Sequence, residues 1–338
     1  MTEARYFPFS AYLKERFGER VHKVSIDAGF TCPNIDGLKA EGGCTYCNNE
    51  GFSYNTRRQI RPISEQIESG AAFMRKRFKA NKFIAYFQAH TNTYAPVPQL
   101  KAVYDQILPY DELVALSVGT RPDCISNNVL DLLESYSDKR EVWVEYGLQT
   151  THNETLRRVN RQDTYERFLW AIEQAEGRNL KICVHVILGL PGESHEDMML
   201  TAERLAAVPY DSLKIHLMHV MKDTQLEEEY HRGEVKIFTL EEYVQVCCDF
   251  LERIRPEVSI QRLTADAPAR ILVAPEWCLE RKHVIASVEA ELERRDSRQG
   301  AVVNSAWLGD QSWRKLISKG AMEPVAEPDH TLPILQSA

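Results

Sequence analysis

Residues 31–47 read TCPNIDGLKAEGGCTYC, and this segment carries the strongest chemical signal in the chain. Its three cysteines, Cys32, Cys44 and Cys47, are separated by eleven residues and then by two, with no fourth cysteine nearby. Iron–sulfur cubes usually take four cysteine thiolates, so a cube held by three would expose one iron. The segment therefore predicts a metal centre with one position open to a small molecule.

Apolar runs rich in β-branched residues alternate along the chain with longer amphipathic runs. The apolar runs predict strands over Val21–Ala28, Phe83–Phe87, Leu113–Val118, Val142–Leu148, Ile182–Leu188 and Leu213–Val220, with a seventh candidate over Val258–Leu263. The amphipathic runs predict helices over Ile63–Lys79, Val97–Ile107, Asn127–Ser135, Tyr165–Ala175, His195–Ala207 and Leu240–Ile254.

Six repeats of strand and helix predict an α/β fold with a parallel sheet and helices on its outer face. A sheet of this length closes wholly or partly, so we expect a partial (β/α)6 TIM-type barrel with a C-terminal extension. Ligand-binding residues gather at the carboxyl ends of such strands, and the three cysteines directly follow the first strand. The expected boundaries are an N-terminal extension over 1–20, the barrel over 21–262, a C-terminal cap or extension over 263–300 and a loosely packed or disordered tail over 301–338.

Composition narrows the setting of the chain. It has 338 residues, of which 43% are hydrophobic and 27% charged, which is typical of a globular protein with a substantial core. The eight cysteines are irregularly spaced and the N-terminus is polar, so we expect a reducing, cytoplasmic location. No apolar run approaches the roughly 20 residues that a membrane helix needs. A net charge of −8 argues against indiscriminate nucleic-acid binding.

Further motifs follow the predicted strands in chain order: GTRPD at 119–123, EYGLQT at 145–150, LRRVNR at 156–161 and HVILGLPGE at 185–193. With the three cysteines, they resemble the motifs of radical S-adenosylmethionine (SAM) enzymes, in particular the branch similar to the Elongator catalytic subunit. The motifs of the fourth and fifth strands are also similar to those of oxygen-independent coproporphyrinogen oxidases. Together with QAHTNTY at 88–94 and QRLT at 261–264, the set resembles the YhcC and YtqA group of small radical enzymes.

This resemblance implies a radical SAM fold and the chemistry of two cofactors. Cys32, Cys44 and Cys47 would hold a [4Fe–4S] cluster whose open iron binds the amino and carboxylate groups of SAM. An electron from a donor such as flavodoxin or ferredoxin would cleave SAM to methionine and a 5′-deoxyadenosyl radical, which abstracts hydrogen from the substrate. We expect apolar strand residues to line the barrel and exclude water.

The resemblance also implies residues for SAM binding. Glu145 and Gln149 are expected at a strand end, where they would offer an acceptor and an amide to the ribose hydroxyls and the amine. Arg158 and Arg161, at the following helix start, would meet the SAM carboxylate. The Gly189–Gly192 turn would let the chain pass close to the adenine. The complete predicted set is Tyr46, Thr91, Glu145, Gln149, Arg158, Arg161, Gly189 and Pro191.

Substrate contacts are predicted from two sources. His90, Asn92 and Arg121 follow strands and could meet the substrate, although satisfied polar residues give the same pattern. A basic run with interleaved aromatic residues spans 57–82 and includes Arg75 and Arg77. It is either a solvated helix face or a phosphate-contacting patch beside the cysteine loop. The resemblance to the Elongator-like branch, which acts on wobble uridines of tRNA, implies modification of a wobble uridine side chain with tRNA as partner.

Two other functions fit the same sequence. A radical SAM enzyme acting on a porphyrin-like or lipid precursor would share the cofactor motifs and make the basic run incidental. A non-catalytic zinc or iron–sulfur protein would supply a fourth protein ligand beside the three cysteines.

Overall fold

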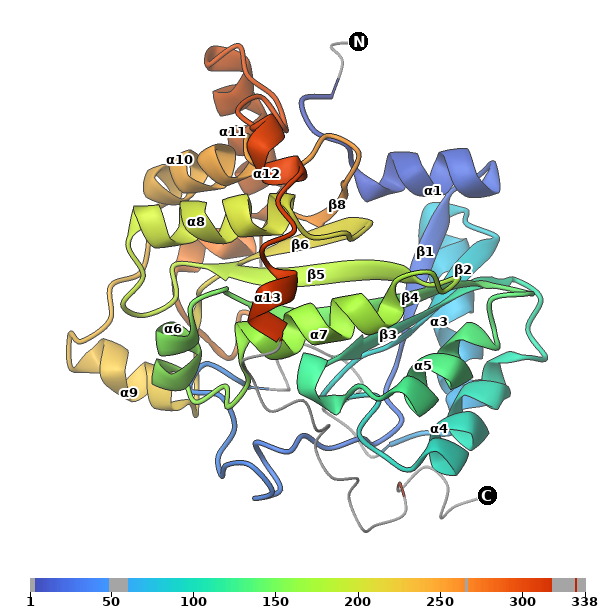
Figure 1. Cartoon of the computed structure of the whole chain (residues 1–338). Coiled ribbons are helices and arrows are strands. Elements are labelled where there is room, and N and C mark those ends of the chain that lie inside the picture. The colour runs from blue at the N-terminus through green and yellow to red at the C-terminus, as the bar shows by residue number, and fades with distance from the viewer. Residues whose placement is uncertain (1–3, 49–59, 265–266, 318–331, 333–338) are drawn as a thin grey trace.

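The computed structural model describes residues 4–48, 60–264, 267–317 and 332. Within these residues, seven parallel strands form one curled sheet in the order β1-β2-β3-β4-β5-β6-β8 (Figure 1). Their bounds are β1 (Val21–Ile26), β2 (Lys82–Phe87), β3 (Leu113–Thr120), β4 (Glu141–Gln149), β5 (Lys181–Leu188), β6 (Ser212–Leu217) and β8 (Ser259–Arg262). The sheet is a half-barrel, which confirms the predicted fold class.

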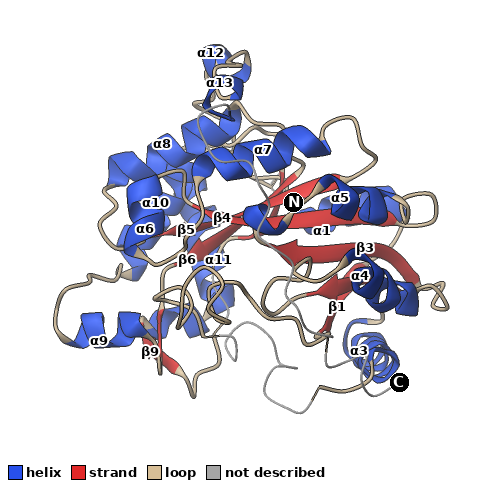
Figure 2. Ribbon diagram, turned by 60° about the horizontal axis from the view of Figure 1, so that its bottom comes forward, coloured by secondary structure: helices blue, strands red, loops and turns tan. Residues whose placement is uncertain are grey.

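Helices cover the outer face of the sheet, as Figure 2 shows in blue against the red strands. The covering helices are α3 (Ile63–Phe78), α4 (Val97–Tyr104), α5 (Asn127–Glu134), α7 (Tyr165–Ala175), α8 (His195–Ala206) and α10 (Leu240–Leu251). Hydroxyl side chains at Ser126, Thr164, Ser194 and Thr239 accept a hydrogen bond from the first turn of α5, α7, α8 and α10. These N-caps explain why the helices begin where the periodicity predicts.

The N-terminal segment closes one end of the barrel. Helix α1 (Phe9–Phe17) places Phe9 and Leu13 against the first inward-facing residues of the strands, which are Val21, Ile84, Ala115, Trp143 and Cys183. The rings of Phe9 and Trp143 meet edge to face at 5.3 Å. The backbone N–H of Ile260 donates to the carbonyl of Phe7 at 2.7 Å, so the segment before α1 also lies along the free edge of β8.

The next inward layer is polar, so the expectation that apolar strand residues line the barrel holds for the first layer and is wrong for this one. Above the apolar layer lie Lys23, Tyr86, Ser117, Glu145, His185 and Lys214. The cause is that successive side chains of a strand point to opposite faces of the sheet. The apolar side chains, such as Val24, Val144 and Ile215, point outward and are buried under the helices. The polar residues of the same strands therefore face the interior.

The C-terminal region is packed in part. Strand β9 (Leu272–Ala274) pairs antiparallel with β7 (Val220–Met221), and α11 (Arg281–Arg294) packs on α10. Beyond it follow α12 (Ser305–Leu308) and α13 (Arg314–Ile317). Trp313 and Ile317 are buried. Arg314 forms ion pairs with Glu173 of α7 and with Glu176, which follows α7. Within the tail predicted from residue 301, residues 313–317 are therefore packed, whereas 301–312 are largely exposed and 318–331 and 333–338 lie outside the described residues. Within the described residues, no helix has the length and apolarity to cross a membrane.

Candidate active site

The three cysteines of the first loop line one cavity of about 900 Å³ in the half-barrel. All three thiols are free, and Cys32 and Cys44 are buried. Burial, with repulsion from Cys44 and Cys32, raises the pKa of the Cys47 thiol. The other five cysteines, Cys124, Cys183, Cys247, Cys248 and Cys278, are also buried, and none of them lines this cavity. Three free thiols from one loop therefore line the same cavity.

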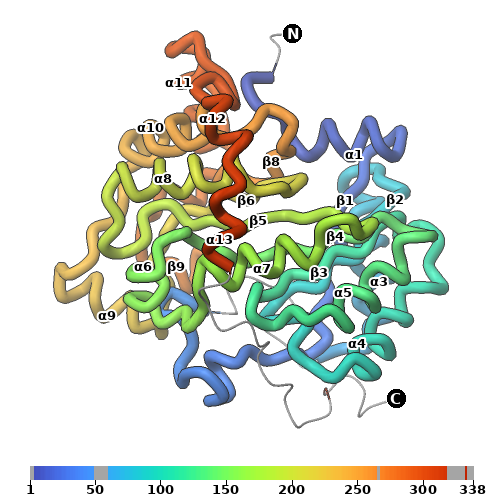
Figure 3. The backbone as a smooth tube through the Cα atoms, in the orientation of Figure 1, coloured from blue at the N-terminus to red at the C-terminus, as the bar shows by residue number. Residues whose placement is uncertain are grey.

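Hydrogen bonds fix the cysteine loop to two helices that lie far away in the sequence. The amide of Asn34 donates to the carbonyls of Asn160 and Arg161, at 2.6 and 2.9 Å, just beyond α6 (Asn153–Arg158). The backbone N–H of Thr45 donates to Val159, and its carbonyl accepts from Leu226 of α9 (Gln225–His231). Figure 3 shows the loop, in blue, running beside α6 and α9. No local pattern in the sequence indicates Asn34, because its partners lie more than 120 residues away.

Arg161 lies in the cavity wall beside the cysteines. It follows the end of α6, not the start of a helix as predicted. Its Nη2 donates to the carbonyl of Gly147 at 2.6 Å, and its Nη1 lies 4.0 Å from the sulfur of Cys44. Gln149 ends β4 with a φ of 74° and lines the same cavity. Arg161 and Gln149 are therefore placed to meet a ligand bound next to the cysteines.

Arg158 takes a different position from the one expected. It is the last residue of α6 and forms a two-fold contact with Glu229 of α9, at 3.1 and 2.7 Å. Its side chain is 41% exposed and does not line the cavity. The prediction that Arg158 meets a ligand carboxylate in this cavity is not supported, because its guanidinium group already donates to the buried carboxylate of Glu229.

The turn after β5 approaches a protein ring closely. Gly189 has a φ of +87°, and a Cβ there would lie 2.7 Å from the ring of Phe238. Neither Gly189 nor Pro191 lines the cavity. The close approach predicted from the glycine is real, but its partner in the structure is Phe238, a residue that the sequence did not indicate.

The turn after β2 adopts a backbone that usually requires glycine. Ala89 and His90 have φ values of 78° and 58°, which are uncommon for residues with a side chain and often mark functional sites. The N–H of Thr91 donates to the carbonyl of Thr31 at 3.1 Å, so this turn is fixed to the cysteine loop. His90 keeps a buried Nδ1 without a partner among the described residues. Asn92 donates its amide to Ala89 and Gly119, which ties the ends of β2 and β3 together.

Arg121 is buried and largely satisfied by the protein. Its Nε and Nη2 donate to the two carboxylate oxygens of Asp123 at 2.8 and 2.7 Å, and Nη2 also donates to the carbonyl of Arg161. Burial opposes ionisation of Asp123, but Arg121 and Lys39 prevail and lower the pKa of that carboxyl. Arg121 therefore positions the cavity wall, and only its Nη1 lacks a partner among the described atoms.

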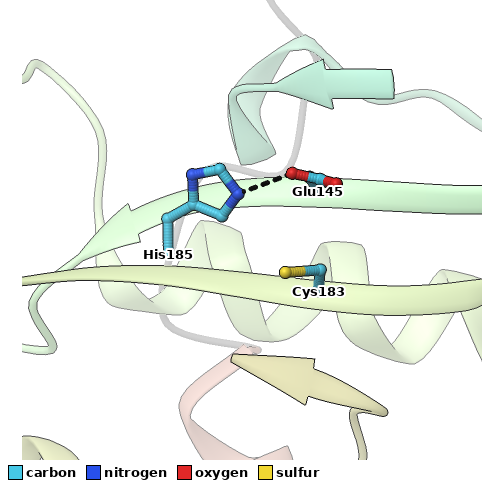
Figure 4. A group of neighbouring side chains, drawn as sticks. All are labelled: Glu145, Cys183 and His185. Carbon is cyan, nitrogen blue, oxygen red and sulfur yellow. Dashed lines mark hydrogen bonds and ion pairs between the residues drawn. The ribbon is translucent and has the colours of Figure 1, made fainter. Parts of the chain in front are cut away.

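Glu145 lies in the middle of β4, so its predicted place at a strand end is wrong. Its carboxylate is buried and accepts from Lys23 at 2.6 Å, Ser117 at 2.5 Å, His185 at 2.9 Å and Lys214. Figure 4 shows the ring of His185 directed at this carboxylate. Burial and Lys214 lower the pKa of His185 to about 4, so its ring is neutral near pH 7. The lysines were detectable, because a lysine inside an otherwise apolar strand is rare.

The basic residues of α3 lie at the opposite end of the barrel from the cysteines. Helix α3 runs antiparallel to the strands it connects, so its last turn reaches the start of β2. Arg75 pairs with Glu112, directly before β3, and Arg77 lies over the ring of Phe78. The predicted patch beside the cysteine loop is therefore wrong for these two arginines. The first part of the basic run, residues 57–59, lies outside the described residues.

Comparisons with known proteins add independent evidence. Residues 40–205 match the model of the radical SAM superfamily, and residues 210–294 match the radical SAM C-terminal domain. The uncharacterized protein YtqA of Bacillus subtilis is 37% identical over 299 residues, which are 88% of this chain and 93% of YtqA. A tRNA uridine(34) acetyltransferase of Methanocaldococcus infernus is 31% identical over 164 residues, 47% of this chain and 30% of that enzyme. The solved structure of archaeal Elp3 from the same organism has a TM-score of 0.60 at 21% identity, covers 82% of this chain and 64% of its own, and shows the same fold.

Proposed function

Because this chain belongs to the radical SAM superfamily and is a radical SAM enzyme, we propose that Cys32, Cys44 and Cys47 hold a [4Fe–4S] cluster. The observation that carries this proposal is that three free thiols from one loop line one cavity. Thiolates are the usual ligands of such clusters, so the donor set fits. The non-catalytic alternative does not agree with membership of this enzyme family.

We place SAM beside the cysteines. Four residues that line the cavity there offer polar groups to SAM: the hydroxyls of Tyr46 and Thr91, the amide of Gln149 and the guanidinium group of Arg161. Once bound, the cluster would pass one electron from a flavodoxin or ferredoxin to SAM, giving methionine and a 5′-deoxyadenosyl radical that takes a hydrogen atom from the substrate. The buried walls of the cavity would keep water away from that step.

The substrate proposed is a tRNA wobble uridine with a modified side chain. Its support is the similarity to a tRNA uridine(34) acetyltransferase, which covers 30% of that enzyme. The cavity of about 900 Å³ is at the large end of the range for small-molecule sites, and in this proposal it would hold the cluster, SAM and a base turned out of its stack. An anticodon base is single-stranded, which lowers the free energy needed to turn it out.

Anaerobic reconstitution tests the cofactor assignment. Wild-type protein is expected to bind about four irons, to absorb near 400 nm, and to form 5′-deoxyadenosine from SAM when reduced. Cys32→Ala, Cys44→Ala and Cys47→Ala should each lose the cluster and this activity. Cys124→Ala is the matched control, because Cys124 is buried nearby and bonded to Asp123 but does not line the cavity. Equal iron content in all four variants would rule out the assignment.

Mass spectrometry of tRNA nucleosides tests the substrate. Cells lacking the gene are expected to show a changed wobble uridine, which a plasmid copy restores and a Cys44→Ala copy does not. An unchanged nucleoside profile would refute the tRNA assignment and favour a small-molecule substrate.

A further inference from the structure

The polar layer inside the barrel carries more positive than negative groups. Lys23 and Lys214 approach one carboxylate, that of Glu145, from two sides. His185 and His216 lie in the same region, with ring centroids 5.3 Å apart, and burial lowers the pKa of both rings. With neutral histidines, the ammonium groups of Lys23 and Lys214 are the cations in contact with this carboxylate, and Arg262 adds a positive charge to the wall of the same cavity. An unbalanced buried charge is unfavourable unless a counter-charge binds next to it.

Hydrogen-bond donors without partners lie in the same wall. Gln261 accepts from Lys23 at 2.7 Å through Oε1, which leaves its buried Nε2 without a partner among the described residues. The buried Nε2 of His216 also lacks a partner among the described residues, and it is a donor in the tautomer that carries the proton there. The ammonium of Lys214 bonds to Glu145 and to the hydroxyl of Tyr86 at 3.0 Å, and so has a third N–H available. These side chains all line the cavity that contains the cysteines. Unpaired donors around a surplus positive charge indicate a site for an acceptor.

A metal ion is a poorer occupant of this layer. Glu145, Cys183 and His185 offer ligand atoms within 4.8 Å of one another (Figure 4). However, Lys214 and His185 already contact one carboxylate oxygen, and Lys23 and Ser117 contact the other. Two ammonium groups repel a cation, and burial raises the pKa of the Cys183 thiol. The same charges attract an anion.

We propose that Lys23, Lys214, His216 and Gln261 form a subsite for a carboxylate group of the substrate. The two lysines, the ring of His216 and the amide of Gln261 can together donate to both oxygens of one carboxylate, whose charge offsets part of the positive charge in this wall. The subsite is distinct from the SAM carboxylate, which is expected at the cluster. The inference rests on the proposed function, because the carboxylate would belong to the modified side chain that the radical acts on. It narrows the substrate to an acidic one.

Calorimetry with cluster-loaded protein and SAM tests the subsite. The probes are 5-carboxymethyluridine and its neutral amide, 5-carbamoylmethyluridine, with propionate and propionamide as a pair that lacks uridine. We expect each acid to bind at least tenfold more tightly than its amide. Equal affinities of acid and amide in both pairs would overturn the subsite.

Three variants test whether the charge balance is the cause. Lys214→Met removes one positive charge and should weaken the preference for the acid. Glu145→Gln removes the negative charge that the lysines contact and should increase the preference. The double variant Lys214→Met/Glu145→Gln has the net charge of the wild type and should recover the preference, even if the single lysine variant folds poorly. A preference that stays the same in all three variants would contradict the proposal.

The two pairs of probes separate the subsite from the proposed function. If propionate binds with the expected charge dependence and neither nucleoside binds, the subsite stands and the uridine assignment fails. If both nucleosides bind equally and no variant changes their affinity, the uridine assignment stands and the carboxylate subsite fails.

Discussion

The guanidinium group of Arg161 donates to the carbonyl of Gly147 at 2.6 Å, a contact between the end of β4 and the segment after α6. A Cβ at position 147 would lie 2.7 Å from Nε2 of Gln149 and 3.0 Å from Nη2 of Arg161. The missing side chain of Gly147 therefore lets both groups reach the cavity beside Cys44. One glycine thus controls two of the proposed SAM contacts.

Gly147→Ala should weaken SAM binding with little loss of stability. The crowded atoms are ends of flexible side chains, so they can move aside at a cost of about 1 kcal/mol or less. Their displacement should raise the Kd for SAM about tenfold in cluster-loaded protein, as measured by equilibrium dialysis. Gly309→Ala, where a Cβ meets nothing closer than 3.8 Å, is the control. An unchanged Kd in Gly147→Ala would remove Arg161 and Gln149 from the SAM site.

Two neighbouring arginines should respond differently to substitution. Arg161→Ala should raise the Kd for SAM at least tenfold, because a guanidinium group beside Cys44 is lost. Arg158→Ala should leave that Kd unchanged and lower the free energy of unfolding by about 1 kcal/mol, since its partner Glu229 belongs to the packing of α6 on α9. SAM titration and urea unfolding of both variants measure this. Equal losses of SAM affinity would return Arg158 to the site.

Stability should fall as pH drops from about 6.5 toward 4. The pKa of His185 is about 4 in the folded protein against 6.5 when unfolded, so the unfolded chain binds the proton first. Between pH 7 and 5 this linkage should remove on the order of 2 kcal/mol from the free energy of unfolding. Urea unfolding of wild type and His185→Gln at both pH values measures it. A variant that loses as much stability as wild type would contradict the assignment.

Binding of tRNA should depend little on the arginines at the far end of the barrel. Arg75→Ala/Arg77→Ala should change the affinity less than twofold, because Arg75 pairs with Glu112 and both lie away from the cysteines. Arg61→Ala is the matched variant. Arg61 precedes α3, where Gln66 bonds to Asp27 at the end of β1, so it lies on the cysteine side. Its loss should lower the affinity several-fold at low salt, as filter binding can measure. The reverse order would place the RNA at the other end.

Local patterns predicted the elements well. The period of apolar residues identifies all seven strands of the sheet, and hydroxyl N-caps mark where α5, α7, α8 and α10 begin. The position of Arg75 and Arg77 was also available from these elements. A helix between two parallel strands must return its last turn to the strand starts. The topology that was predicted correctly therefore excluded the patch that was predicted beside the cysteines.

Contacts between distant segments were not available from any local pattern. Arg158 and Arg161 are three positions apart in one motif. Only the contact between α6 and α9 places Glu229 against Arg158, while Arg161 lines the cavity. Gly189 signals a close approach, but the ring of Phe238 that fills the space lies 49 residues further along the chain. Such partners depend on which surfaces meet after folding.

The sequence alone determined the half-barrel and the place of the three cysteines after β1, because both follow from periodicity and chain order. Only the tertiary structure decided what the barrel encloses. Strand alternation shows that Lys23, Glu145 and Lys214 share one face of their strands, but curling of the sheet brings β1, β4 and β6 together around one carboxylate. The charge of that interior depends on how the curled sheet brings several strands together, and it cannot be read from any one strand.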